Sequence, residues 1–225
     1  MLQGALALAD TLPFMPVGVH VAIVDPGVGG SRRPLALAGA DGRLYVGPDN
    51  GILLVAAERL GGVVEAVEIT SPGIVLEPVS PTFHGRDVFS PAAAHLSLGV
   101  PLGALGPHLD PAELVRLELP RPRVEAGRLQ ATVLAVDRFG NVRLNLEGGD
   151  LEQAGIAQGD GVDVVLDSRR YAGLVARTFA DVRPGELILY EDASGAMALA
   201  VNRGSAARTL GVLVGEEVTL TGVRP

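Results

Sequence analysis

Two short stretches concentrate the side chains that could do chemistry. SPTFHGRDVFSP, at residues 80–91, places an imidazole, a guanidinium and a carboxylate within four residues and beside a glycine. VHVAIVDPGVGGSRRP, at 19–34, runs an apolar strand into Asp25 and then into a glycine turn with two arginines. An imidazole exchanges protons near neutral pH, whereas an arginine keeps its charge and stabilises anions. We therefore expect the two stretches to meet in space and to perform one reaction.

Taken singly, each stretch also has a plain structural explanation. The first is typical of a helix N-terminus with a surface Arg86–Asp87 pair, and the second of a strand-to-loop turn. Established nucleotide motifs do not fit either stretch. Arg32 stands where a dinucleotide fingerprint has its third glycine, and a P-loop needs a lysine. Gly85 interrupts the His-Arg-Asp run of a kinase catalytic loop.

Composition removes several classes of chemistry. The 225 residues include no cysteine, and all 18 basic residues are arginine. Thiol nucleophiles, disulfides, cysteine-bound zinc and Schiff-base lysines are thereby excluded. The net charge of −8 gives no reason to expect nucleic-acid binding. Apolar runs are too short for a membrane span, and the N-terminus lacks the basic start of a signal peptide, so we expect a cytoplasmic protein.

The pattern of the chain changes near residue 120. Residues 1–119 alternate helix and strand signals, which predicts an N-terminal α/β domain with a central sheet. Residues 120–128, within LPRPRVEAGR, are typical of a linker. In residues 129–225, short strands separated by Gly and Asp turns predict a small C-terminal β-barrel domain. The elements expected in the first domain are helices at 2–12, 52–60 and 92–98, strands at 19–24 and 63–70, and a hairpin of two strands within 34–51, joined at the Ala-Asp-Gly of 40–42.

The barrel half holds two further candidate stretches. AVDRFGNVRLNL, at 135–146, crowds Asp137, Phe139 and Asn141 into one turn. That turn offers a polar cradle with one aromatic face, suited to a flat heterocycle with hydroxyls, although a simple β-turn explains it as well. NRGSAA, at 202–207, precedes a short helix and offers backbone N–H groups.

A metal site is an alternative reading of the acidic and imidazole side chains. Asp25, Asp49, His84 and Asp87 form a possible set of oxygen and nitrogen ligands. The usual zinc spacings of paired histidines are absent from the sequence, and so is the GxSxG turn of serine hydrolases. A metal-dependent hydrolase using Asp25, Asp49 and His84 nevertheless stays open at this point.

Five motifs taken together resemble one family. VDPGVGGSRR, VGPDNG, TFHGRDVFSPAAAHL, VDRFGN and AVNRGSAA occur in the order seen in S-adenosyl-L-methionine (SAM) hydrolases that form adenosine. These enzymes are also called SAM hydroxide adenosyltransferases and are relatives of the fluorinating and chlorinating SAM enzymes. The resemblance implies an α/β domain, a β-barrel and a homotrimer. It also implies that substrate lies between the first domain of one subunit and the barrel of its neighbour, with no metal or redox cofactor.

The same resemblance assigns residues. It places a water-activating triad on Asp25, Arg32 and His84, a set that favours water over halide, with Phe83 and Gly85 beside the pocket. We expect His84, oriented by Asp25, to accept or polarise the water proton, and Arg32 to stabilise developing hydroxide. On the barrel, the resemblance assigns substrate contacts to Asp137, Phe139, Asn141, Ser194, Asn202 and Ala206.

One departure from the family concerns its usual first strand, which carries a Thr-Asp-Phe-Gly motif whose Asp holds the ribose hydroxyls. These 225 residues contain no such motif, and Asp10 in ALADTLP is not a substitute. We therefore expect a sheet with an unpaired edge. A catalytically weak or silent trimer that binds adenosine or SAM remains a further alternative.

Overall fold

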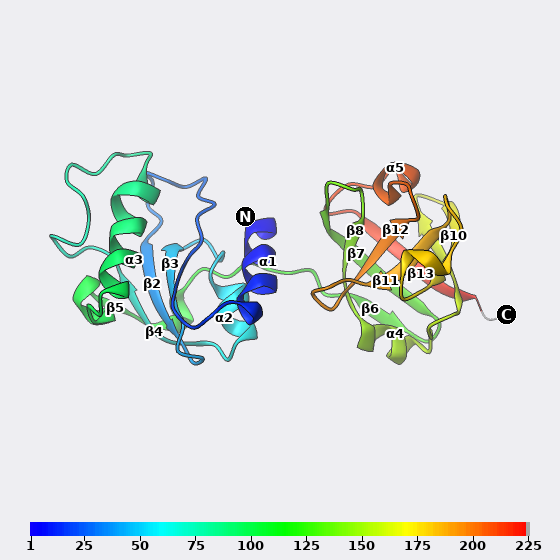
Figure 1. Ribbon diagram of the computed structural model, residues 1–225, viewed down its shortest axis with the longest axis horizontal. Helices are drawn as coiled ribbons and strands as arrows, with labels where there is room; N and C mark the ends of the chain where they lie inside the picture. Colours follow the sequence, from blue (N-terminus) through cyan, green and yellow to red (C-terminus); the bar gives the residue numbers. More distant parts are fainter. Residues whose placement is uncertain (224–225) are drawn as a thin grey trace. The chain divides into compact units, whose positions relative to one another are not determined.

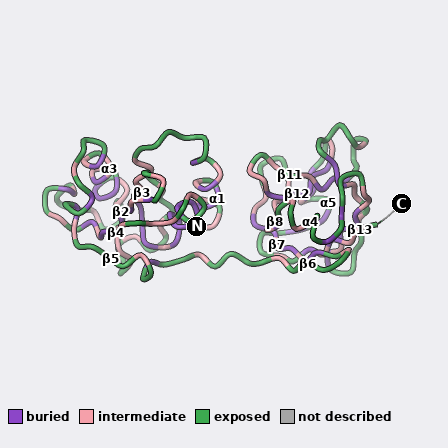
Figure 2. Tube along the Cα trace, turned by 90° about the horizontal axis from the view of Figure 1, so that it is seen from below, coloured by how far each residue is buried: buried purple, intermediate pink, exposed green. Residues whose placement is uncertain are grey.

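A computed structural model describes residues 1–223, which form two compact units, Met1–Glu118 and Leu119 onward (Figure 1). Each unit has its own buried core, drawn in purple in Figure 2. Among the described residues, no helix has the length and apolar character needed to cross a bilayer.

The first unit is built on a five-stranded mixed sheet with strand order β1-β3-β2-β4-β5. Only the β1–β3 pair is parallel. The elements are α1 (Leu2–Thr11), β1 (Val19–Val21), β2 (Pro34–Gly39), β3 (Leu44–Pro48), α2 (Leu54–Arg59), β4 (Val63–Glu68), the π-helical turn η2 (Gly85–Phe89), α3 (Ser90–Ser97) and β5 (His108–Leu109). Single 3₁₀ turns lie at Leu12–Phe14, Leu102–Leu105 and Pro111–Glu113.

Alternating side chains place this sheet between two helical layers. Leu35 and Leu37 of β2 belong to the core beneath α1 and α2, whereas Ala36 belongs to the core beneath α3. Figure 1 shows α3 on the other side of the sheet from α1 and α2. Since successive strand residues point to opposite faces, a nearly continuous apolar strand can serve both layers. The predicted α/β domain with a central sheet is confirmed.

The strand expected at 19–24 is shorter than its apolar run indicates. β1 ends at Val21, although the N–H of Ala22 still donates to Val46 O at 3.1 Å. Pro48, farther along β3, has no N–H to continue the ladder. Ile23 and Val24 are therefore no longer part of the sheet, and their side chains are exposed. The chain continues from them to Asp25.

The second unit is a β-barrel. Its elements are β6 (Arg123–Glu125), β7 (Arg128–Val136), β8 (Val142–Glu147), α4 (Gly148–Ala154), β9 (Gly161–Leu166), β10 (Arg169–Val175), a 3₁₀ turn (Phe179–Asp181), β11 (Leu187–Glu191), β12 (Ala196–Val201), α5 (Ala206–Leu210) and β13 (Glu217–Val223). The strand order is β13-β9-β10-β11-β12-β8-β7-β6, and pairing of β13 with β7 closes a ring of seven strands. The predicted C-terminal barrel is confirmed, and β6 falls within the stretch 120–128.

Candidate active site

The two stretches that the sequence singles out lie against each other in the first unit. Gly29 has a φ of 76°, in the region that favours glycine, and a Cβ at this position would collide with the carbonyl oxygen of Pro81. The glycine turn after β1 is thereby packed directly on the loop that precedes η2. This contact brings Asp25 and Arg32 into the neighbourhood of His84.

Arg32 is the centre of the resulting cluster. Its Nε and Nη2 both donate to Oδ2 of Asp25, at 2.9 and 2.5 Å, and Nη2 also lies 2.7 Å from Nδ1 of His84. The side chains of Asp25 and Arg32 are only 6% and 10% exposed. The guanidinium carbon stands 5.2 Å from the ring centroid of buried Phe89, a cation–π contact. The cation is therefore fixed from three sides.

The arrangement of Asp25, Arg32 and His84 differs from the expected one, in which Asp25 orients His84 directly. Arg32 lies between them, and an arginine has hydrogen-bond donors only. Nδ1 of His84 must then be the acceptor, so the neutral ring carries its proton on Nε2. Burial and the charge of Arg32 lower the pKa of His84 below its ordinary value of 6.5, against weaker opposing effects of Asp25 and Asp87. The cluster thus presents an imidazole N–H donor at neutral pH.

Asp87 anchors the loop that carries His84. Its carboxylate is buried, accepting from the backbone N–H of Ser80 at 2.8 Å and from Nε of Arg86 at 2.6 Å. The hydrogen bond from Arg86, followed by that from Ser80, lowers the pKa of Asp87 to about 2. The expected surface pair Arg86–Asp87 is therefore half correct, because the arginine is exposed and the carboxylate is not. The π-helical turn that begins at Gly85 follows directly, a feature frequent at functional sites.

Asn50 supports the other side of the cluster and was missed as a site residue. Its Nδ2 donates to the carbonyl of Val24 at 2.9 Å, next to Asp25, while its Oδ1 accepts from Ile52 N–H at 3.2 Å. The VGPDNG motif signalled a special loop, but nothing in the sequence indicated that its amide reaches the end of β1. Asn50 therefore positions the backbone that carries Asp25.

The set of metal ligands considered from the sequence is not assembled. Both oxygens of Asp49 are occupied: Oδ2 accepts from Nε of Arg33 at 2.8 Å and Oδ1 from the N–H of Val115 at 2.9 Å. Within residues 1–223, no three His, Asp or Glu side chains are grouped to hold a metal ion. Asp49 instead fastens β3 to the segment after β5.

The two other predicted residues of this unit flank the cluster differently. Phe83 is 59% exposed, with the Arg86 guanidinium carbon 5.2 Å from its ring centroid. Gly85 is half-buried, and a Cβ there would lie 3.5 Å from Ile23 Cδ1. Phe83 thus offers an open aromatic face, and Gly85 keeps the turn close to the end of β1.

In the barrel unit, Asp137, Phe139 and Asn141 form one turn between β7 and β8. Oδ1 of Asp137 accepts from the N–H groups of Phe139 and Asn141, at 2.8 and 2.9 Å, and Oδ2 accepts from Asn141 Nδ2 at 2.8 Å. Gly140, with a φ of 86°, packs on Ser205, which caps α5. The Phe139 ring, 63% exposed, therefore stands on a turn closed by three hydrogen bonds to Asp137.

The remaining three barrel residues have different surroundings. Ser194 lies in the β11–β12 hairpin, where its N–H and Oγ bind Oδ1 of Asp192 at 2.8 and 2.6 Å. Asn202 Nδ2 donates to Val182 O at 2.8 Å. The methyl group of Ala206 is fully buried in the barrel core. A ligand contact by Ala206 would have to use its backbone.

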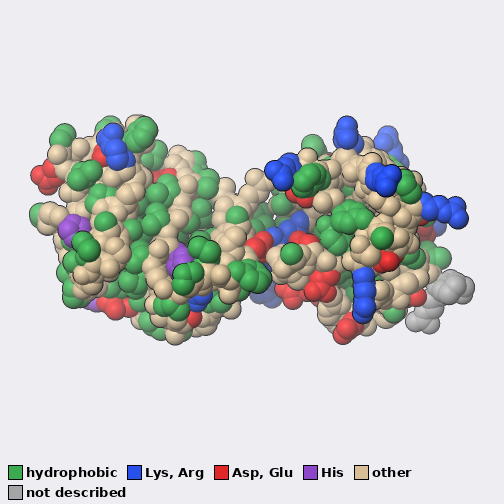
Figure 3. All heavy atoms as spheres, viewed as in Figure 1, with side chains coloured by type: hydrophobic (Ala, Val, Ile, Leu, Met, Phe, Trp, Pro, Cys, Tyr) green, Lys and Arg blue, Asp and Glu red, His purple; other side chains and the backbone are tan. Residues whose placement is uncertain are grey.

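Charged side chains of both signs are interspersed on the barrel unit in the view of Figure 3.

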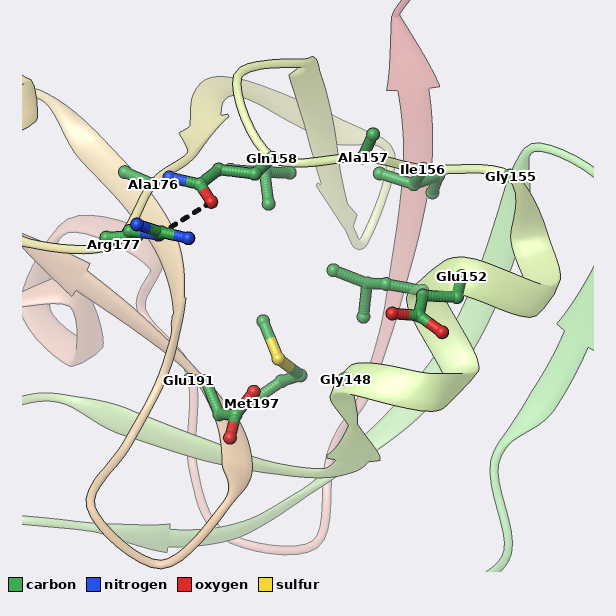
Figure 4. A pocket seen from close by; sticks show the side chains of 12 residues that line it. Gly148, Glu152, Gly155, Ile156, Ala157, Gln158, Ala176, Arg177, Glu191 and Met197 are labelled. Carbon is green, nitrogen blue, oxygen red and sulfur yellow. Dashed lines mark hydrogen bonds between the residues drawn. The ribbon is translucent and has the colours of Figure 1, made fainter.

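The barrel unit also contains a cavity of about 770 Å³ between α4 and the ends of β10 to β12. Figure 4 shows Glu152 on the α4 side of this cavity, Glu191 next to Met197 across from it, and Arg177 hydrogen-bonded to Gln158 at 2.9 Å. None of the site residues predicted from the sequence lines this cavity.

Comparison with protein families decides the relationship. The N-terminal domain model of the SAM hydroxide adenosyltransferases matches residues 1–106, and the C-terminal domain model matches residues 131–219. The chain belongs to the SAM hydroxide adenosyltransferase family. The resemblance drawn from its five motifs is therefore correct.

Alignments with individual relatives extend over nearly the whole chain. It is 48% identical to an (R)-S-adenosyl-L-methionine hydrolase of Salinispora tropica over 97% of this chain and 80% of the relative. It is 39% identical to a Thermus thermophilus protein of the same name, over 97% and 82%. A fluorinase of Actinopolyspora mzabensis is 33% identical over 97% and 82%.

A solved structure supports the fold of this chain. A conserved protein of Thermotoga maritima superposes with a TM-score of 0.91 at 35% identity, covering 98% of this chain and 83% of that one. Both the mixed sheet with its helices and the closed barrel therefore have an experimental counterpart.

Proposed function

We propose that this chain hydrolyses SAM to adenosine and methionine, with Asp25, Arg32 and His84 as the water-activating cluster. The observation that carries the proposal is the guanidinium of Arg32 hydrogen-bonded to both Asp25 and His84, in a member of this family. Relatives at 48% and 39% identity that are named (R)-SAM hydrolases support the same reaction. Their names favour the (R) sulfonium epimer as substrate.

The chemistry matches the side chains of the cluster. SAM carries a sulfonium, so attack of water at the 5′ carbon of the ribose expels methionine as a neutral thioether that needs no proton. Activating the nucleophile is the difficult part, because bulk water has a pKa of roughly 15.7. Arg32 is permanently cationic and stabilises hydroxide character as it develops. Because the guanidinium is already held in place, it need not be reoriented as negative charge develops during the reaction.

Phe83, Gly85 and the barrel residues Asp137, Phe139, Asn141, Ser194, Asn202 and Ala206 are proposed as substrate contacts. The exposed rings of Phe83 and Phe139 are suited to cover the flat adenine, and neither ring is needed to fill a core. A homotrimer, in which the barrel of one subunit completes the site of its neighbour, belongs to the same proposal, and so does a cytoplasmic location.

The test is to incubate the purified chain with SAM in the presence of a chelator and to quantify adenosine and methionine. Equal amounts of both products, lost in a His84→Ala variant, are expected. A His108→Ala variant is the matched control, because the His108 side chain is 65% exposed and its Nδ1 lies 3.5 Å from Oε1 of Glu65. Inhibition by the chelator would favour a metal-dependent hydrolase. SAM binding by calorimetry without turnover would identify a silent SAM-binding protein.

A further inference from the structure

Two groups of the cluster point to roles that differ from those first expected. Both hydrogen bonds of Arg32 to Asp25 go to the same oxygen, Oδ2. The other oxygen, Oδ1, is buried and has no hydrogen-bond partner among residues 1–223. His84, in turn, accepts from Arg32 at Nδ1 and has its remaining nitrogen, Nε2, protonated.

An ionised oxygen without a donor is costly inside a protein. Leaving a buried acceptor without a donor is destabilising, and more so when the group is charged. The working site must therefore provide a donor to Oδ1. Residue 27 is a glycine, and a Cβ there would stand 3.8 Å from Oδ1, so this flank of the carboxylate is left open. Among the reacting groups, the nucleophilic water is the one that can donate, because the sulfonium and the 5′ carbon have no O–H or N–H.

The imidazole is poorly placed to take that proton. Protonation at Nδ1 would replace the lone pair that accepts from Arg32 with a hydrogen facing a cation. Nε2 already carries a hydrogen in the tautomer that Arg32 selects. His84 can therefore donate to the oxygen of a water molecule but cannot accept its proton without losing its contact with Arg32.

We propose that Oδ1 of Asp25 accepts the proton of the attacking water, while Nε2–H of His84 holds the oxygen of that water in line with the 5′ carbon. This assignment rests on the proposed SAM hydrolysis. As the water oxygen bonds to the 5′ carbon, the carbon–sulfur bond breaks and its electron pair stays on sulfur. The water proton passes to Asp25 and then to solvent, so SAM and water give adenosine, methionine and one proton.

Two variants of similar size separate the roles. Asp25→Asn keeps the size of the side chain but removes the acceptor charge, and we expect hydrolysis to fall about 10²-fold or more. His84→Gln removes any general base but can present an amide N–H near the position of Nε2. We expect this variant to stay within about tenfold of the wild type and well above His84→Ala, since a donor alone is needed. The opposite ranking, with Asp25→Asn active and His84→Gln inactive, would make His84 the acceptor.

A reaction with azide tests whether Asp25→Asn loses activity because the proton acceptor is gone or because the active site is distorted. Azide is already an anion, and its attack on SAM gives 5′-azido-5′-deoxyadenosine and methionine with no proton to remove. We expect Asp25→Asn to form this product at a rate near that of the wild type while its hydrolysis is lost. Loss of both reactions in a folded variant that still binds SAM would reduce Asp25 to a positioning residue and overturn the assignment. A wild type that releases no adenosine from SAM would instead refute the proposed function itself.

Discussion

Nη2 of Arg32 stands 2.7 Å from Nδ1 of His84, although the two residues are 52 positions apart in the sequence. This single contact links the glycine turn after β1 with the loop before α3. It also sets the tautomer of the imidazole, because a guanidinium can only donate. Geometry around one arginine thus decides which nitrogen of His84 carries the proton.

Arg32→Lys should abolish most of the activity despite keeping the charge. A lysine ammonium is a point charge and cannot reproduce the planar fork that reaches Asp25 and His84 together. We expect turnover to fall about 10²-fold or more, as when a preorganised donor is removed. Steady-state kinetics with SAM measure it, with Arg116→Lys as control because that arginine pairs with Glu58 on the surface. Equal losses in both variants would contradict a special role for Arg32.

Gly29→Ala should damage the site by separating its two loops. An alanine at a φ of 76° is strained by roughly 1–2 kcal/mol, and its Cβ would also push against Pro81. Gly99→Ala is the matched control, because it has a φ of 88° and open space around the new methyl group. We expect similar backbone strain in both variants, measured by urea unfolding, but a large loss of turnover only in Gly29→Ala. Comparable turnover in the two would show that the loops tolerate separation.

The depressed pKa of His84 predicts a pH dependence of stability. Between its lowered folded pKa and 6.5, the unfolded chain binds a proton at this position that the folded chain does not. The free energy of unfolding should therefore rise with pH across that window and level off above it. His84→Gln should remove this part of the slope, leaving the similar contribution of His20, whose pKa burial also lowers. Denaturant unfolding at several pH values, wild type against variant, measures the difference, and identical slopes would contradict it.

The turnover rate should depend on the ionisation of His84 as well. Protonated His84 can no longer accept from Arg32, so kcat should fall on the acid side below 6.5 and stay level from neutral to mildly alkaline pH. A pH–rate profile of the wild type tests this. A decline that begins above pH 7 would assign the limiting ionisation to another group.

Asp87→Asn should loosen the loop that carries His84. The asparagine keeps an oxygen for Ser80 but loses the charge that binds Arg86. We expect a lower melting temperature and a several-fold drop in turnover, with less effect on SAM binding, because Asp87 only positions the imidazole. Arg86→Ala should cause the same changes, and the double variant should be no worse than either single one. Independent, additive effects would argue against a shared role.

Mixing two inactive variants tests the proposed sharing of sites between subunits. His84→Ala is defective in the first domain and Phe139→Ala in the barrel. If each site combines one domain from each of two neighbours, co-expressed trimers should recover roughly one quarter of the intact sites, the product of two halves. Adenosine release by the purified mixture measures the recovery. An unchanged, inactive mixture would place each site within a single subunit.

Patterns of apolar residues predicted most of the fold. The β2–β3 hairpin, α1 and α3 appear within a few residues of where periodicity and turn residues placed them. The sequence pattern does not indicate β10, because its exposed start follows an Asp167–Ser168 turn with two positive φ values and no glycine. The predicted strand 19–24 is longer than β1, because hydrophobicity does not reveal that Pro48 of β3 lacks the N–H needed to continue the β1–β3 ladder. Local pattern thus predicts elements better than their pairing.

Side-chain chemistry was predictable only in part. Residue types and spacing indicated that Asp25, Arg32 and His84 act together, but not that the arginine lies in the middle. The burial of Asp87 and the reach of Asn50 to Val24 depend on loop conformations stabilised by contacts distant in sequence. Such contacts leave no periodic signal, so sequence patterns cannot order the members of a cluster.

The place of β1 in the sheet also bears on how firmly Asp25 is held. Within its unit, β1 shares a ladder with β3 alone, over three residues, and Val21, Ile23 and Val24 remain exposed. The carboxylate of Asp25 therefore follows a weakly anchored strand. Amide hydrogens of this segment should exchange sooner than those of β2, which is paired on both sides. Any strand that added to the free edge would slow that exchange and steady Asp25 at the same time.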